Sequence, residues 1–294
     1  MKSATSIEAF AAPLFVFIWS TGFIIARFGM PYMEPATFLF LRFTGVLMVM
    51  GVIILFWKPI WPNRSQTGHI AVAGALLQFG YVMGVWSAVR LGMTAGLIAL
   101  IVGLQPILTA WSASWVSERV NYRQWLGLIL GIGGVALVVA EKTSFLDIPI
   151  SAYGYAIAAL FAITFGTLYQ KKFCPDFDLR AGSMIQFSIS TVLCLFVALL
   201  FETRQIVWNA PVIGALLWGI LPTSIGAISL LFILIRKGAA TKVTSLLYLT
   251  PPTTALMAWI LFDEPLTLMM LTGLMLTMTA VILVNYQGKV GAQR

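Results

Sequence analysis

Residues 104–139, LQPILTAWSASWVSERVNYRQWLGLILGIGGVALVV, contain the pattern that decides the fold. Two apolar runs flank the polar segment SERVNYR, and Pro106 lies inside the first run. At 1.5 Å per residue, a helix needs about 20 apolar residues to cross about 30 Å of hydrocarbon. The run GLILGIGGVALVV is apolar on every side, whereas the strands of a membrane barrel alternate polar and apolar residues. The stretch therefore predicts two successive transmembrane helices.

Composition places the whole chain in a membrane. Of its residues, 60% are hydrophobic and 10% are charged, against about 25% charged in a typical soluble domain. Apolar runs of about 20 residues follow one another with short polar breaks. They predict an all-α membrane protein with ten transmembrane helices, at residues 9–28, 35–57, 68–90, 94–117, 121–140, 151–171, 180–201, 212–235, 240–262 and 266–287.

Lysine and arginine residues are divided unevenly between the two sets of loops. With the N-terminus inside, thirteen fall in the inner segments and four in the outer ones. Cytoplasmic loops carry the excess of positive charge, so we expect a multi-pass protein of the cell inner (cytoplasmic) membrane with both termini cytoplasmic. The net charge of +8 then reflects topology and contact with the lipid bilayer. No basic stripe interleaved with aromatic residues indicates nucleic-acid binding.

Rare residue types recur at a fixed distance along the chain, which indicates an internal repeat. At an offset of 146 residues the matched pairs are Pro106 and Pro252, Glu118 and Glu264, Gly127 and Gly273, Gly80 and Gly226, and Arg90 and Arg236. Near the start of each repeat the offset becomes 144, which pairs Gly22 with Gly166 and Phe43 with Phe187. The chain therefore divides into two homologous halves, residues 1–143 and 144–294.

Each half contains five predicted helices. Because five is odd, the second half enters the membrane from the opposite side, so the halves are inverted repeats. Inverted repeats are an architecture of secondary transporters, with the substrate site near the midplane between the halves. The inference to a transporter rests on analogy of architecture, not on a catalytic residue.

Several tracts resemble a known family. LQPILTAWSASWVSERVNYRQWLGLILGIGGVALVV is similar to the fourth and fifth helices of an EamA domain of the drug/metabolite transporter superfamily, and WSTGFIIARFG with PATFLFLRFTG looks like its first loop and second helix. The second half resembles it more loosely, through LTPPTTALMAWILFDEPLTLMMLTGLML, with Gln186 in the place of Arg42. The resemblance implies a ten-helix carrier of the inner membrane that moves small metabolites, often amino acids, or drugs outward.

All ten carboxylates of the sequence fall in loops or at the ends of predicted spans. Proton-driven carriers usually place titratable residues inside their spans, so we expect no carboxylate relay within the membrane. Arg42 is the one full charge clearly inside a span. It lies seven residues after Pro35, so it either snorkels to the outer interface or pairs with a loop carboxylate such as Glu34, in a structural or gating role, or it contacts a substrate carboxylate.

Polar and aromatic residues within the spans are the candidates for a substrate-binding cavity, although helix packing is the alternative for each. The predicted substrate-binding set is Trp19, Ser20, Arg42, Gln78, Tyr81, Trp86, Gln105, Thr164, Tyr248 and Thr250. Proline within a helix frees the carbonyl four residues earlier, and such carbonyls are tolerated where they face a cavity or a neighbouring helix. The predicted helix-break and gating residues are Pro106, Pro251, Pro252, Gly22 and Gly166.

Glu118 and Glu264 are predicted to set turns between helices. Each lies at the end of one helix and just before the next, whose N-terminus favours negative charge. The two cysteines have neither disulfide nor metal-ligand spacing, so we expect no metal and no cofactor. Glycines four apart, at Gly80 and Gly84, favour close packing within the monomer, with a homodimer interface as the alternative.

The sequence therefore predicts a secondary transporter that exports a small-molecule substrate, with amino acids or related compounds as the first choice and multidrug efflux as the alternative. A channel would be expected to show a filter-like loop or a charged ring. An enzyme would be expected to show a motif such as H-E-x-x-H or G-x-S-x-G, and neither occurs. A channel or a membrane scaffold without transport activity remains a further alternative.

Overall fold

The computed structural model describes residues 4–114, 122–139, 148–227, 230 and 249–285, and most of these are helical. The first half contains α1 (Ala4–Gly29), α2 (Pro35–Phe56), α3 (Arg64–Gly74), the π-helix η1 (Ala75–Gly80), α4 (Tyr81–Arg90), α5 (Ala95–Val102), α6 (Gln105–Ser114) and α7 (Tyr122–Val139). The second contains α9 (Ile150–Phe173), α10 (Leu179–Phe201), α11 (Ala210–Trp218), the π-helix η2 (Gly219–Gly226), α14 (Thr250–Phe262) and α15 (Leu268–Asn285). The described residues form no strand, only an isolated bridge between Met33 and Ile206.

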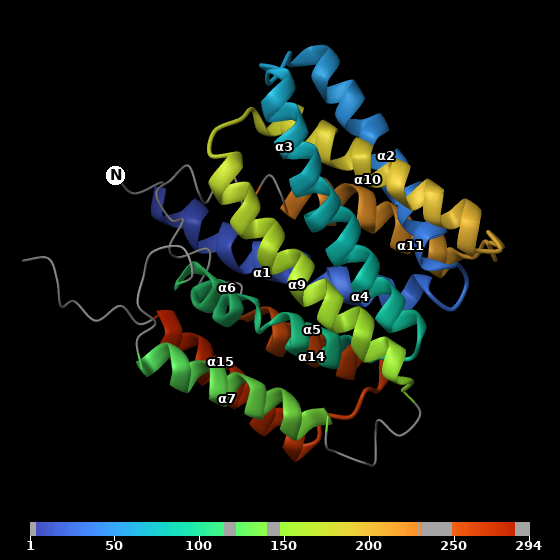
Figure 1. Cartoon of the computed structure of the whole chain (residues 1–294). Coiled ribbons are helices and arrows are strands. Elements are labelled where there is room, and N and C mark those ends of the chain that lie inside the picture. The colour runs from blue at the N-terminus through green and yellow to red at the C-terminus, as the bar shows by residue number, and fades with distance from the viewer. Residues whose placement is uncertain (1–3, 115–121, 140–147, 228–229, 231–248, 286–294) are drawn as a thin grey trace, which may run out of the picture.

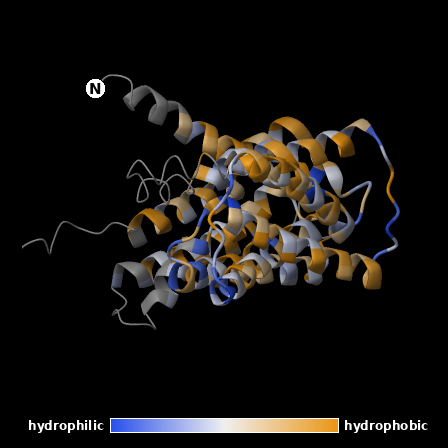
Figure 2. Ribbon diagram, turned by 90° about the horizontal axis from the view of Figure 1, so that it is seen from above, coloured by the Kyte–Doolittle hydropathy of each residue, from blue (hydrophilic) through white to orange (hydrophobic). Residues whose placement is uncertain are grey.

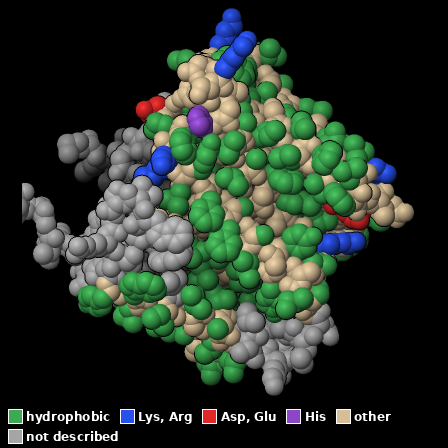
Figure 3. All heavy atoms as spheres, viewed as in Figure 1, with side chains coloured by type: hydrophobic (Ala, Val, Ile, Leu, Met, Phe, Trp, Pro, Cys, Tyr) green, Lys and Arg blue, Asp and Glu red, His purple; other side chains and the backbone are tan. Residues whose placement is uncertain are grey.

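Each of the ten predicted spans contains helix among the described residues. Four helical stretches are long and apolar enough to cross a membrane by length and composition, namely Pro35–Phe56, Arg64–Arg90, Ile150–Phe173 and Leu179–Phe201. Shorter apolar helices lie in the first, fourth, fifth, eighth and tenth spans. Most of the helical ribbon in Figure 2 is coloured as hydrophobic. Hydrophobic side chains also cover much of the face in Figure 3, as a lipid-facing surface requires. The predicted all-α membrane fold is confirmed.

α2 and α10 pack side by side and run in opposite directions. At one end, the Glu202 carboxylate, just after α10, accepts hydrogen bonds of 2.7 Å from the backbone N–H groups of Ala36 and Thr37 in the first turn of α2. At the other end, Arg180 in the first turn of α10 donates to the carbonyl of Trp57, just after α2, at 3.1 Å. The second and seventh spans are therefore antiparallel, as inverted repeats require.

The other spans also pair between the two halves. α5 packs on α14 and α7 on α15, which joins the fourth span to the ninth and the fifth to the tenth. α4 packs on α9 and α1 on α11, pairing the third span with the sixth and the first with the eighth. If each span is replaced by its equivalent in the other half, the third–sixth pair becomes the eighth–first pair and the reverse, and every other pair stays the same. In Figure 1 the pair of α7 and α15 forms one edge of the bundle, away from α2 and α10.

Small residues let several of these helices approach closely. A Cβ added to Gly273 would lie 2.7 Å from the carbonyl oxygen of Gly134, so α15 and α7 touch through their backbones. A Cβ on Gly84 would lie 2.8 Å from the carbonyl oxygen of Tyr155, and one on Gly80 would lie 3.2 Å from Ala162. The face that carries Gly80 and Gly84 therefore packs on α9 within the monomer.

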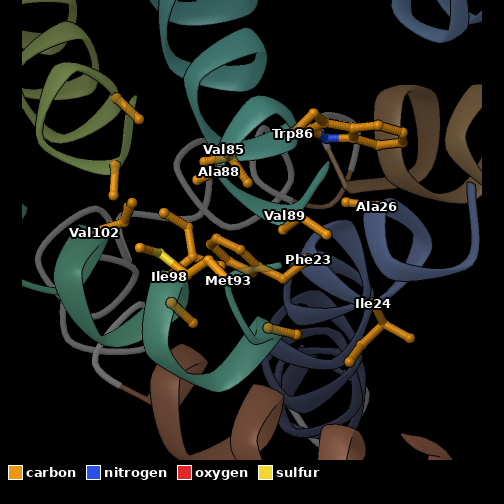
Figure 4. Packing of buried hydrophobic residues seen from close by; sticks show 14 of the residues in the cluster. Phe23, Ile24, Ala26, Val85, Trp86, Ala88, Val89, Met93, Ile98 and Val102 are labelled. Carbon is orange, nitrogen blue, oxygen red and sulfur yellow. The ribbon is translucent and has the colours of Figure 1, made fainter. Parts of the chain in front are cut away.

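The bundle core lies where α1, α4 and α5 meet. Phe23, Met93 and Ile98 come together there in Figure 4 and are at most 3% exposed. Trp86 is 1% exposed, and its ring centroid lies 4.5 Å from that of Phe38 in α2. This packing holds the inner faces of α1, α2 and α4 around the site described below.

A set of contacts that we call the outer clasp joins residues 32–37 to residues 202–207, at the end of the bundle predicted to face outward. Glu202 caps α2 as described above, and Glu34 in return accepts from the backbone N–H and hydroxyl of Thr203, both at 2.7 Å, and from the N–H of Arg204 at 3.1 Å. The N–H of Val207 also donates to the carbonyl of Tyr32 at 3.0 Å. The clasp links the N-terminus of α2 in the first half to the C-terminus of α10 in the second.

Candidate functional site

A cavity of about 380 Å³ lies between the two halves. Residues of α1, α2, η1, α4 and α6 line it from the first half, and residues of α9, α10 and η2 from the second. The lining reaches Phe177 and Leu179, at the end of the bundle predicted to face inward. Ligand sites for small molecules typically have volumes of about 300–1,000 Å³. The cavity is therefore large enough for a small metabolite.

Most of the predicted binding residues of the first half line this cavity. They are Trp19, Arg42, Gln78, Tyr81, Trp86 and Gln105, and the predicted gating residue Gly22 lines the cavity as well. An adjoining pocket of about 40 Å³ shares Trp19, Tyr81 and Gln105 with it and is also lined by Thr250 and Pro251. The structure thus brings predicted residues from five spans to one place.

Ser20, Thr164 and Gly166 line neither pocket. Ser20 is fully buried, and its hydroxyl donates to the carbonyl of Thr250 at 3.5 Å. Thr164 is fully buried and donates to the carbonyl of Leu160 in its own helix at 2.7 Å. A Cβ on Gly166 would lie 2.8 Å from the Leu77 side chain. These three positions therefore pack against helices, and α9 lines the cavity through Ile163, Thr167 and Gln170 instead.

The structure places the predicted helix-break prolines in the first turns of helices. α5 ends at Val102 and α6 begins at Gln105, so Pro106 lies in the first turn of a new helix. Pro251 and Pro252 lie likewise in the first turn of α14, where a proline costs no hydrogen bond. The gating role of these positions stays a prediction, and the predictions for Tyr248 and Glu118 concern residues outside the described ones.

The second half supplies lining residues that the sequence interpretation missed. They are Ile163, Thr167, Gln170, Phe177, Leu179, Ser183, Gln186, Phe187, Thr223 and Ser224. The Gln186 side chain donates to that of Gln170 at 2.9 Å, and Gln186 is only 8% exposed. One signal was available, since Gln186 occupies the place of Arg42 in the repeat and is an amide inside an apolar span.

Arg42 lies inside the cavity wall, 6% exposed. Its Nε donates to the carbonyl of Gly219 at 3.1 Å, and one terminal nitrogen donates to the Ser224 hydroxyl at 3.0 Å. The guanidinium carbon also lies 5.8 Å from the ring centroid of Trp86. The side chain therefore neither snorkels outward nor pairs with Glu34, whose carboxylate belongs to the outer clasp. A structural or gating role and contact with a substrate carboxylate both stay predictions.

The π-helices η1 and η2 lie in the third and eighth spans, which are equivalent in the two repeats. The wider π-turn loosens the regular hydrogen-bond ladder, and such turns are frequent at functional sites. In η2 the carbonyl of Gly219 accepts from both Arg42 and the Ser224 hydroxyl. In η1 the preceding carbonyl, that of Gly74, accepts from Ser190 of α10 at 3.2 Å. Side chains of α2 and α10 therefore donate hydrogen bonds to backbone carbonyls at the start of the two irregular segments.

Glu264 differs from its predicted role. Its carboxylate, 7% exposed, accepts from the backbone N–H groups of Ala95 at 3.2 Å and Gly96 at 3.5 Å, and lies 3.8 Å from Arg27. Burial raises the pKa of Glu264, although the two N–H groups and Arg27 oppose that shift. Glu264 therefore caps α5 of the other repeat, rather than the head of the tenth helix.

Comparison with known proteins agrees with this architecture. The EamA-like transporter family matches residues 6–140 and again residues 150–286. The uncharacterized transporter YvbV of Bacillus subtilis (strain 168) is 30% identical over 283 residues, which cover 93% of this chain and 90% of that protein. A probable amino-acid metabolite efflux pump of Salmonella typhimurium is 28% identical over 166 residues, which cover 56% of this chain and 54% of that protein.

A solved crystal structure has the same fold, with a TM-score of 0.65 and 18% identity over 93% of this chain and 94% of that one. The two segments matched by the family lie on either side of the predicted repeat boundary. These matches, the antiparallel pairing of equivalent spans and the apolar helices lead to one conclusion. The chain is a multi-pass membrane protein that belongs to the EamA-like transporter family.

Proposed function

We propose that the chain exports small metabolites, with amino acids or related compounds as first candidates, by alternating access between its two repeats. The observation that carries the proposal is the cavity of about 380 Å³ that both repeats line and that contains Arg42 in its wall. A site between inverted repeats is what this mechanism requires, because rocking one half against the other exposes the site to each side in turn.

Contacts between the two halves close the bundle at its predicted outer end. The outer clasp joins the two halves through Glu34 and Glu202, while the cavity lining includes Phe177 near the predicted inner end. We therefore propose that the structure faces the cytoplasm, that the protein lies in the cytoplasmic membrane and that both termini are inside. The excess of lysine and arginine in the inner segments supports this orientation.

Energy coupling follows from where the carboxylates lie. The described acidic residues outside α1, from Glu34 to Glu264, all lie between helices and not within them. A proton relay inside the membrane would need titratable groups along the spans. We propose that transport proceeds without such a relay, so that exchange of substrate across the membrane needs no pH gradient.

Counterflow in proteoliposomes tests the proposal. Vesicles containing the purified protein are loaded with an unlabelled amino acid at equal internal and external pH, and the same labelled amino acid is added outside. We expect transient accumulation of label for at least one amino acid, which a channel would not produce because conductance only equilibrates the label. Accumulation of organic cations with no response to any amino acid would favour multidrug efflux instead, and no counterflow of either class would contradict a carrier function.

A further inference from the structure

Arg42 sets the charge of the cavity. It is the one permanently charged side chain among the described residues that line it, and the remaining polar lining consists of amides, hydroxyls and the Tyr81 phenol. Both hydrogen-bond acceptors recorded for Arg42 are neutral, one a carbonyl and one a hydroxyl. Within the described part of the chain, neither of the two ion pairs involves Arg42. As far as the described residues go, a cation therefore lines the cavity without a counter-ion.

The guanidinium retains capacity for a ligand. It carries five N–H donors in a planar fork, and the described residues accept from its Nε and from one terminal nitrogen only. A buried charge without a partner is costly, whereas a carboxylate would supply both the opposite charge and a matching planar pair of acceptors. The geometry of Arg42 therefore favours an anionic carboxylate over a neutral or cationic ligand.

Aromatic residues surround the same group. The guanidinium carbon lies 5.8 Å from the ring centroids of both Trp86 and Phe43. Trp19, Phe23 and Phe187 line the cavity as well. An organic group attached to the carboxylate would thus lie against apolar and aromatic surface, which is the usual composition of a small-molecule site.

No carboxylate occurs among the described lining residues to balance an ammonium group. A substrate amine would find only neutral acceptors, such as the oxygens of Gln78 and Gln105, and it would add a second positive charge to that of Arg42. The equivalent position in the other repeat is Gln186, whose side chain is bound to Gln170. Of these two equivalent positions, only Arg42 therefore provides a cationic group in the cavity, which is enough for one carboxylate.

We propose that the cavity recognises amphiphilic monocarboxylates through Arg42, and that an α-amino group is tolerated but not required. The inference rests on the proposed transport function and narrows its substrate class. It separates an exporter that recognises amino acids as such from one that recognises a carboxylate attached to an apolar body.

Four matched probes test the inference on the purified full-length protein: phenylalanine, 3-phenylpropionate without the amine, 2-phenylethylamine without the carboxylate, and 3-phenylpropionamide without the charge. Binding is measured as a rise in the unfolding temperature, since a ligand that binds only the folded state stabilises it, and by competition in counterflow. We expect 3-phenylpropionate to bind at least as well as phenylalanine, and the amine and the amide to bind weakly or not at all.

Variants connect the probe series to Arg42. Arg42→Gln should weaken binding of 3-phenylpropionate by about 10- to 100-fold, the range for losing hydrogen bonds to a charged group, while binding of the amide should stay unchanged. Arg42→Lys keeps the charge without the planar fork, so it should retain part of the affinity. Arg64→Gln is the matched control, because it removes an exposed cation at the start of α3 that does not line the cavity. It should leave binding within about twofold of the parent.

The outcomes distinguish the two proposals. If phenylalanine binds and 3-phenylpropionate does not, the amine is required, and the inference fails while amino-acid export stands. If 3-phenylpropionate shows counterflow and no amino acid does, amino-acid export fails and the inference stands. Binding of 2-phenylethylamine as strong as that of 3-phenylpropionate would overturn the inference. If Arg42→Gln does not fold, the probe series on the parent protein and on Arg42→Lys still decides it.

Discussion

Removing the Glu202 carboxylate should open the outer clasp. Glu202 accepts three hydrogen bonds of 2.7 Å, from the backbone N–H groups of Ala36 and Thr37 and from the Thr37 hydroxyl. Hydrogen bonds to a charged group contribute about 1.5–3 kcal/mol each, but these three share one half-buried carboxylate that water can solvate when the clasp opens. We therefore expect Glu202→Ala to cost the closed clasp about 2–3 kcal/mol in total.

This cost has a measurable effect on the two-state equilibrium. Because 1.4 kcal/mol is a factor of ten, the ratio of open to closed clasp should rise by about 30- to 150-fold. A cysteine at Thr223, which lines the cavity, reports the change in a chain that carries Cys174→Ser and Cys194→Ala. In intact cells, a membrane-impermeant maleimide should label Thr223→Cys slowly in this parent and much faster when Glu202→Ala is added.

Arg64→Gln serves again as the control. Arg64 begins α3, beyond the C-terminal end of α2, whereas the clasp lies at the N-terminal end of α2. Labelling in detergent should be equally fast in all variants, which shows that the cysteine itself has not changed. An external labelling rate that is the same with and without Glu202→Ala would refute the clasp. Faster labelling from the cytoplasmic side instead would mean that the orientation proposed above is reversed.

Two further substitutions test the packing and the electrostatics of the fold. Gly273→Ala places a Cβ 2.7 Å from the carbonyl oxygen of Gly134, so it should cost about 1–3 kcal/mol of stability and lower the unfolding temperature in detergent. Gly133→Ala is the control, because a Cβ there would meet open space, and it should leave the unfolding temperature unchanged. Equal effects of the two substitutions would contradict the close contact of α7 and α15. The hydrogen bond from Arg180 lowers the pKa of Asp178 to about 2. Its stabilisation is therefore present above the unfolded pKa of about 4 and is lost as the pH falls toward 2. Asp178→Asn should be less stable than the parent at pH 7, with the difference shrinking on acidification, whereas a difference independent of pH would contradict this origin.

The class of the fold was predictable because hydropathy and repetition act along the chain. Ten apolar runs required ten helices, and the fixed offset between Pro106 and Pro252 required two equivalent halves. The break between α5 and α6 followed from the missing N–H of Pro106. Trp19, Arg42 and Gln78 could be chosen because a polar or amphipathic group within an apolar span needs a partner or a cavity.

Contacts between distant spans were not predictable in the same way. Glu264 follows α14 by position but caps α5, because antiparallel pairing brings these two helix ends together. Glu202 caps α2 for the same reason, and its position after the seventh span gave no sign of it. Likewise Thr167, not Thr164, lines the cavity. The rotation of α9 is set by its packing on α4 and η1, which a helix that is apolar on most sides does not reveal.

The π-helices were also absent from the sequence interpretation. The third and eighth spans are read as continuous helices, and nothing in ALLQFG or GILPTSIG apart from Pro222 indicates a wider turn. Their positions follow from tertiary contacts, with Arg42 bound to the carbonyl of Gly219 and Ser190 bound to that of Gly74.

Blocking the cavity tests most directly whether it is the transport path. Ser183 lines the cavity from α10, and Ser183→Cys, in the chain with Cys174→Ser and Cys194→Ala, allows a bulky maleimide to be attached there. We expect the unlabelled variant to show counterflow of the substrate found above, stoichiometric labelling to abolish it, and excess substrate to slow the labelling. Counterflow that continues at the same rate after complete labelling would show that substrate does not pass through this cavity.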